Sequence, residues 1–194
     1  MISKLSKKIV NQLNILDDEQ ELYEYGFFIL LSQILYFIIA IIIGTICGTV
    51  FESIIFYIAF QFIRRYAGGY HAATETRCEI LSTLSILACI VVIRLSKTYD
   101  IQTALLIISA LSAVCIFVFC PLDTPEKPLT DKEFRYFRKV SWLILLAIVV
   151  AIIVSYIFKF KIFTVPCCLS LVLESILLTA GKIKRISQKN NVKT

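Results

Sequence analysis

The chain has 194 residues, of which 58% are hydrophobic and 18% are charged, and its net charge is +6. A soluble domain is typically nearer half apolar and a quarter charged, so this composition excludes an ordinary soluble enzyme and indicates a polytopic membrane protein. The basic residues are divided among short segments without a nucleic-acid-binding module, so we expect no nucleic acid partner.

Residues 1–25 form an amphipathic N-terminal region. Apolar residues recur there at helical spacing, at Ile2, Leu5, Ile9, Leu13 and Leu16. This pattern predicts a helix that lies on the inner surface of the lipid bilayer. An acidic run over residues 17–24 follows as a connector, which is either simply solvated or a docking surface for a basic partner. No short apolar core followed by small residues opens the chain, so we expect no cleavable signal peptide.

Six apolar segments follow, each close to the ~20 residues that a helix needs to cross the hydrocarbon core. They cover residues 26–43, 46–63, 80–95, 101–120, 140–158 and 162–180. Such long runs, without the alternation of a membrane barrel, are not strands. We therefore expect an all-α integral membrane bundle of about six transmembrane helices, with residues 1–194 forming a single domain.

The distribution of lysine and arginine orients these spans. If the N-terminus is cytoplasmic, sixteen of the 20 basic residues lie inside, in residues 1–25, 64–79, 121–139 and 181–194. The outside keeps only Arg94, Lys97, Lys159 and Lys161. We therefore expect a cell membrane protein with both termini in the cytoplasm. In that reducing compartment its seven cysteines need no disulfides, and packing is the expected role of the Cys167–Cys168 pair, with redox chemistry as the alternative.

Residues 64–79, RRYAGGYHAATETRCE, contain the only histidine, His71, and a cysteine seven positions later, Cys78. On a straight helix these two residues would lie about 10.5 Å apart along the axis. A His–Cys nucleophilic dyad therefore requires a break in the helix between them. Gly68 and Gly69 can supply this break, because glycine readily adopts positive φ angles.

The sequence TRCE then fits a capping box, with Thr76 as the N-cap and Glu79 as the third helical residue. Cys78 would be the second residue of the next helix, where the positive end of the helix dipole favours a thiolate and free backbone N–H groups could bind an oxyanion. The alternative is a solvated histidine and an inert cysteine. One histidine with scattered cysteines matches no usual zinc site, so we expect neither a metal nor a cofactor.

Two of the polar residues inside apolar segments are candidates for the site. Glu174 lies in the last span, and an intramembrane carboxylate is a functional candidate by default. Glu174 could orient His71 or lie protonated between helices, and it could instead pair with Arg64 or Arg65. Gln61 is either an oxyanion donor or a partner in a helix–helix hydrogen bond.

The two arginines at the cytoplasmic end of the second span also allow two interpretations. Arg64 and Arg65 could bind an acidic tail of a substrate, or they could mark the inner membrane interface, which is our expectation for Arg65. Farther along, three prolines exclude a regular helix from the first half of residues 121–139, and Thr130 with Glu133 predicts a short capped helix in the second half. Residues 181–194 are expected to be a basic tail.

The stretch RRYAGGYHA, with a cysteine seven positions after its histidine, resembles the accessory gene regulator B (AgrB) family, membrane-embedded cysteine endopeptidases of Gram-positive bacteria. The chain length, the amphipathic N-terminus, the apolar spans and the KPL sequence of residues 127–129 are also similar. The resemblance implies that Cys78 is the nucleophile and His71 its base, with Arg64 and Gly69 in supporting roles. The further candidates for supporting roles are Arg65, Gly68, Gln61 and Glu174.

The resemblance also implies an activity. Such a protein removes the C-terminal tail of a short AgrD-like precursor through an acyl-enzyme thioester and promotes cyclisation to a thiolactone or lactone peptide for quorum sensing. Its partners would be this propeptide and the lipid bilayer, and by analogy a second copy in a homodimer. The alternatives are a small membrane transporter or exporter of a peptide and a non-catalytic membrane scaffold. A transporter favours internal repeats and helices broken at mid-membrane, and the sequence has no visible repeat.

Overall fold

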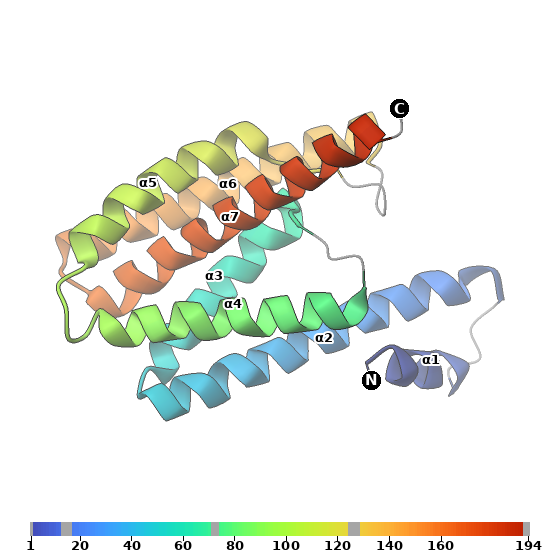
Figure 1. Cartoon of the computed structure of the whole chain (residues 1–194), viewed down its shortest axis with the longest axis horizontal. Coiled ribbons are helices and arrows are strands. Elements are labelled where there is room, and N and C mark those ends of the chain that lie inside the picture. The colour runs from blue at the N-terminus through green and yellow to red at the C-terminus, as the bar shows by residue number, and fades with distance from the viewer. Residues whose placement is uncertain (1, 13–16, 71–73, 124–128, 192–194) are drawn as a thin grey trace.

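The computed structural model describes residues 2–12, 17–70, 74–123 and 129–191, and these form seven α-helices without a strand among them (Figure 1). In chain order the helices are α1 (Ile2–Gln12), α2 (Asp17–Cys47), α3 (Val50–Ala67), α4 (Glu75–Leu95), α5 (Gln102–Phe119), α6 (Asp131–Ile157) and α7 (Lys161–Asn191). The predicted all-α membrane bundle is confirmed.

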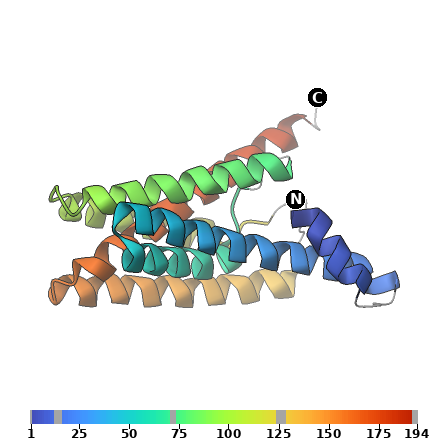
Figure 2. The same ribbon diagram turned by 90° about the horizontal axis from the view of Figure 1, so that it is seen from below.

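Each predicted span corresponds to one of the helices α2 to α7. Five of these, namely α2, α4, α5, α6 and α7, are long and apolar enough to cross a membrane. The exception is α3, which carries Glu52, Arg64 and Arg65 within its 18 residues. α3 runs alongside α2 in Figure 2 and also packs on α6 and α7, so it is part of the bundle, but a sixth crossing stays a prediction.

The first and last helices have ends on the same side of the bundle. The start of α1 and the end of α7 both lie on the right in Figure 1. The end that faces the cytoplasm is still set only by the distribution of basic residues. α1 packs on α2 through buried Ser6 and Val10, and Lys7 Nζ lies 3.8 Å from Glu24 Oε2. Leu5 is 49% exposed, so it remains available to lipid.

Three boundaries differ from the sequence prediction. The acidic residues 17–24 are the first turns of α2 rather than a connector, because this segment contains strong helix formers and no glycine or proline. Thr130 and Glu133 form the predicted capping box, but the helix that it starts continues to Ile157 instead of remaining short. The expected basic tail after residue 180 is also helical, since α7 extends to Asn191.

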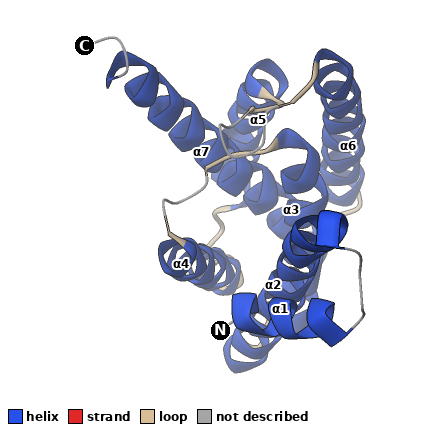
Figure 3. Ribbon diagram, turned by 90° about the vertical axis from the view of Figure 1, so that its right-hand side faces the viewer, coloured by secondary structure: helices blue, strands red, loops and turns tan. Residues whose placement is uncertain are grey.

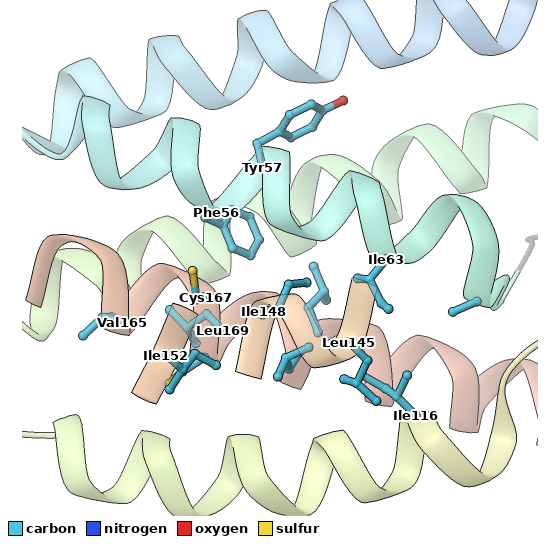
Figure 4. Close-up of a cluster of buried hydrophobic side chains, with 14 of the residues drawn as sticks. Phe56, Tyr57, Ile63, Ile116, Leu145, Ile148, Ile152, Val165, Cys167 and Leu169 are labelled. Carbon is cyan, nitrogen blue, oxygen red and sulfur yellow. The ribbon is translucent and has the colours of Figure 1, made fainter. Parts of the chain in front are cut away.

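The hydrophobic core lies where α3, α5, α6 and α7 meet. Figure 4 shows the side chains that fill it, among them Phe56 and Ile63 of α3, Ile116 of α5, Ile148 of α6 and Leu169 of α7. In the end-on view of Figure 3, α7 lies among α3, α5 and α6, and of the five membrane-length helices it is the most buried. The helix that comes last in the sequence is therefore the central packing element.

Candidate catalytic site at the junction of α3, α4 and α7

The helix break that the dyad requires is present. α3 ends at Ala67, Gly68 (φ 77°) and Gly69 (φ 145°) turn the chain, and α4 begins at Glu75. The predicted property of the two glycines, a positive φ, is confirmed. His71 lies outside the described residues, so its distance to Cys78 stays a prediction.

Arg64, in the last turn of α3, holds the segment that follows the helix. Its Nη1 donates to the Gly68 carbonyl at 2.9 Å, and its Nη2 donates to the Tyr70 carbonyl at 2.7 Å. A Cβ on Gly69 would overlap the guanidinium, so only glycine allows the loop to wrap so closely around this side chain. The planar guanidinium, with its fixed fork of donors, suits two carbonyls that project from one turn of chain.

The same segment is also bound by α7 and by the chain that follows α5. The Tyr70 N–H donates to the Leu177 carbonyl of α7 at 3.0 Å, and the Leu122 N–H donates to the Ala67 carbonyl at 2.8 Å. A Cβ on Gly68 would lie 2.7 Å from the Leu122 carbonyl oxygen. Residues 68–70 are thus enclosed by α3, α7 and the segment after α5, and His71 is the next residue in the chain.

Glu174 of α7 lies beside this segment with its side chain fully buried. Its Oε2 is 4.0 Å from Arg64 Nη1, and within the described part of the chain neither carboxylate oxygen has a hydrogen-bond partner. Of the alternatives for Glu174, the geometry shows the pairing with Arg64. Arg65 is exposed and its guanidinium lies 6.0 Å from the centre of the Tyr66 ring, as suits a residue at the membrane interface.

The start of α4 differs from the prediction. The N-cap is Thr74 rather than Thr76, and its Oγ1 accepts a hydrogen bond from the Arg77 N–H at 3.4 Å. Either threonine can cap a helix, and the earlier one gives a longer helix with more backbone hydrogen bonds. The expected capping box with Glu79 is therefore wrong, and Cys78 is the fourth helical residue rather than the second.

This shift changes what Cys78 can do. Its own N–H donates to the Thr74 carbonyl at 3.1 Å, so it cannot bind an oxyanion. The N–H groups of Glu75 and Thr76, which precede the first intrahelical bond, are the donors that the helix start still offers. The Cα–Cβ bonds of a helix tilt toward its N-terminus, so the thiol still leans toward the positive end of the dipole.

All seven cysteines are free thiols, and Cys78 is half-buried at the end of a helix. Tyr36, on α2, lies close to Cys78, Glu79 and Ser82, where α2 packs along α4. Sequence reasoning missed Tyr36, because nothing in the first span indicates that it packs against the start of α4. The deeper thiols Cys120, Cys167 and Cys168 are buried in the core.

Gln61 lies one turn before Arg64 and faces α2. Its Nε2 donates to the Tyr57 hydroxyl at 2.7 Å, and that hydroxyl donates to the Gln33 carbonyl of α2 at 2.7 Å. The bond that Gln61 itself makes stays within α3, and its partner Tyr57 makes the hydrogen bond across to α2. The structure thus gathers Arg64, Gly68, Gly69 and Glu174 into one cluster, while Gln61 belongs to the contact between α2 and α3.

Two features that thiol chemistry on a peptide would use lie close together in the chain. A backbone segment, fixed on several sides, ends directly before the only histidine, and a partly accessible thiol lies in the first turns of the next helix. Residues 71–73 and Thr74 connect the two parts. A short link of this kind, unlike a continuous helix, allows an imidazole and a sulfur to approach each other.

Comparison with known proteins gives a consistent result. The family model described as accessory gene regulator B matches residues 2–178. An AgrB-like protein of Clostridium perfringens is 27% identical over 151 residues, which cover 74% of this chain and 71% of the relative. The accessory gene regulator protein B of Staphylococcus intermedius is 26% identical over 135 residues, which cover 69% of this chain and 62% of that protein. No solved structure matches the chain significantly.

Proposed function

Because the chain belongs to the accessory gene regulator B family, which acts in quorum sensing, we propose that it is a membrane-embedded cysteine endopeptidase that processes a short AgrD-like precursor peptide. In this proposal Cys78 is the nucleophile and His71 is its base. Arg64 and Gly69 support the dyad by fixing the loop. The site faces the cytoplasm, so the precursor meets it on the inner side of the membrane.

The observation that carries this proposal is the break between α3 and α4. The break separates Cys78 from the helix that precedes His71, and the bonds of Arg64 to the Gly68 and Tyr70 carbonyls fix the chain up to the residue before His71. A solvated histidine in a loop would not need the residues before it to be held in place. Nucleophilic catalysis by cysteine requires this, because the imidazole must reach hydrogen-bond distance of the sulfur.

The first step is acyl transfer to the enzyme. The Cys78 thiolate attacks the peptide carbonyl that precedes the tail, and the tetrahedral oxyanion is stabilised by backbone N–H donors. The C–N bond breaks, and the imidazolium of His71 gives its proton to the leaving amine. The tail departs, and the remaining peptide is bound to Cys78 as a thioester.

The second step closes the ring. An internal cysteine thiol of the bound peptide attacks the thioester carbonyl, its proton passes to the imidazole, and the bond from the carbonyl to Cys78 sulfur breaks. One thioester replaces another, so no ATP is needed. Water competes for the same acyl group, and a site at the membrane border that limits water favours the ring over hydrolysis. An amphipathic leader on the same membrane face would raise the local concentration of the precursor.

The test is co-expression of the chain with a candidate AgrD-like precursor, followed by mass spectrometry of the peptide products. We expect tail-free peptide with the wild-type chain and none with Cys78→Ser or His71→Ala at equal membrane levels. Cys47→Ser is the matched control, since Cys47 is a half-buried thiol at the other end of the bundle, and it should retain processing. Cleavage by the Cys78→Ser chain would refute the proposal.

The same experiment decides the transporter alternative. A transporter would leave cleavage unaffected in every variant and would change only the amount of peptide outside the cell. The described helices give this alternative little support, since α2 to α7 are each continuous and Pro166 lies only five residues after the start of α7.

A further inference from the structure

One face of α7 contacts the loop that leads to His71. Glu174, Leu177 and Gly181 stand at positions i, i+3 and i+7, so they lie on the same side of the helix. Each contacts the loop in a different way. Glu174 acts through its charge, Leu177 through its backbone carbonyl, and Gly181 through the absence of a side chain. Farther along the same face, Lys184 Nζ lies 5.5 Å from the centre of the Tyr70 ring.

Glu174 supplies the charge. The carboxylate is fully buried in the most enclosed helix, where an uncompensated charge is strongly unfavourable. Within the described residues its one ion-pair partner is Arg64, with 4.0 Å between Oε2 and Nη1. That same guanidinium donates to the Gly68 and Tyr70 carbonyls. Glu174 therefore keeps the guanidinium in the place from which it binds the loop.

Gly181 supplies the space. A Cβ at this position would lie 3.0 Å from the Gly69 carbonyl carbon and 3.0 Å from the Tyr70 nitrogen, and it would also overlap the Leu122 side chain. Two of these three neighbours are backbone atoms, which cannot rotate away. Glycine is unfavourable inside a helix, and these contacts give a packing reason for its presence in α7.

We propose that Glu174 and Gly181 are positioning residues of the peptidase, which act by fixing Arg64 and residues 68–70 on α7. This inference rests on the proposed function, because it concerns the same site. In this proposal neither residue takes part in the reaction itself. Both determine where the loop lies, and so where the residue after Tyr70 is presented to the thiol at the start of α4.

The test compares Gly181→Ala and Glu174→Gln with the wild-type chain, purified and reconstituted in proteoliposomes, using the precursor that the co-expression experiment shows to be cleaved. Gly26→Ala is the matched control, since a Cβ at Gly26 of α2 meets nothing within 4 Å. We expect kcat per folded enzyme to fall at least tenfold in both variants, with KM within about twofold. The Gly26→Ala chain should match the wild type.

Two further measurements distinguish positioning from simple packing. The pH profile of Cys78 alkylation by iodoacetamide, read at residue 78 by mass spectrometry, needs no substrate. It should shift in both variants toward the profile of the His71→Ala chain. In addition, Glu174→Gln should have little further effect on kcat in an Arg64→Lys background, because Glu174 acts through Arg64 and residues that act as a unit are not additive.

The outcomes separate this inference from the function on which it rests. If the wild-type chain cleaves no precursor, the proposed function fails and this inference fails with it. If the wild type cleaves and Cys78→Ser does not, but both variants retain the wild-type kcat and alkylation profile, the function stands and this inference is overturned. It is overturned equally if the two variants only lower the amount of folded protein. If Gly181→Ala does not fold, Glu174→Gln decides alone.

Discussion

Arg64 makes contacts that a lysine could not make from the same position. Its two Nη groups reach carbonyls two residues apart, and the same guanidinium faces a buried carboxylate. The sequence shows an arginine before a Gly-Gly pair, a histidine and a cysteine. This pattern is enough to identify His71 and Cys78 as candidates for a catalytic dyad by their chemistry. It does not show which carbonyls Arg64 binds, because those contacts depend on the φ angles of Gly68 and Gly69 and on the position of α7.

The first prediction at this scale is that Arg64→Lys lowers processing at least about tenfold. A lysine keeps the charge but loses one of two charge-assisted hydrogen bonds, each worth about 1.5–3 kcal/mol, and 1.4 kcal/mol corresponds to a factor of ten. The measurement is the rate of tail release in proteoliposomes. Arg94→Lys, an exposed position at the far end of α4, is the control and should process normally. Equal rates for the two variants would contradict the prediction.

The second prediction concerns Gly69. Gly69→Ala should abolish detectable processing, because φ is 145° there and the new Cβ would overlap the Arg64 guanidinium. Gly48→Ala is the matched control. Gly48 also has a positive φ, 65°, but a Cβ there meets nothing within 4 Å. That variant should lose some thermal stability and keep its activity, and a loss of processing in both would show that backbone strain anywhere, and not the loop, is responsible.

At the scale of elements, the caps fix where the helices start and so where the side chains of their first turns lie. The Thr-x-x-Glu pattern correctly predicted the start of α6 at Thr130, and the same pattern misplaced the start of α4 by two residues. The difference is that α4 has two threonines that can cap, Thr74 and Thr76, and the capping-box spacing to Glu79 favoured Thr76, whereas the structure uses Thr74. The choice matters for chemistry, since it changes the position of Cys78 relative to the start of α4 by about half a turn.

A third prediction follows from these two caps. Thr74→Ala and Thr130→Ala each remove one N-cap, which costs about 1 kcal/mol, and each should lower the Tm in detergent by roughly 2–4 °C. Only Thr74→Ala should also lower processing, by several-fold, because the fraying helix start carries Cys78. The measurement pairs thermal unfolding with peptide release. If Thr130→Ala impaired processing as much, the cap on α4 would have no special role.

For the whole molecule, hydropathy predicted all six helices of the bundle to within a few residues at most of their ends, because burial in lipid demands long apolar runs. It did not predict how these helices pair. The central position of α7, and with it the contact of Glu174 with Arg64 across 110 residues of chain, depends on packing between segments that share no local signal. The same limit explains why Tyr36 and Gly181 were missed.

The topology is testable with two natural thiols. Cys47 ends α2 and Cys78 begins α4, at opposite ends of the bundle (Figure 1). In chains that retain only one of them, a water-soluble maleimide should modify Cys78 in inside-out vesicles and Cys47 in intact cells. The distribution of basic residues sets this direction. Modification of Cys78 in intact cells would place the site on the outer side and contradict a cytoplasmic reaction.

The place of α7 in the chain also affects how the protein matures during synthesis. Translation proceeds from the N-terminus, so α3 and α4 enter the membrane well before residues 174–181 leave the ribosome. Until then Arg64 lacks its carboxylate and the loop lacks the surface on which it rests. In a nascent chain the proposed nucleophile would thus be inactive, and processing would begin only after α7 inserts.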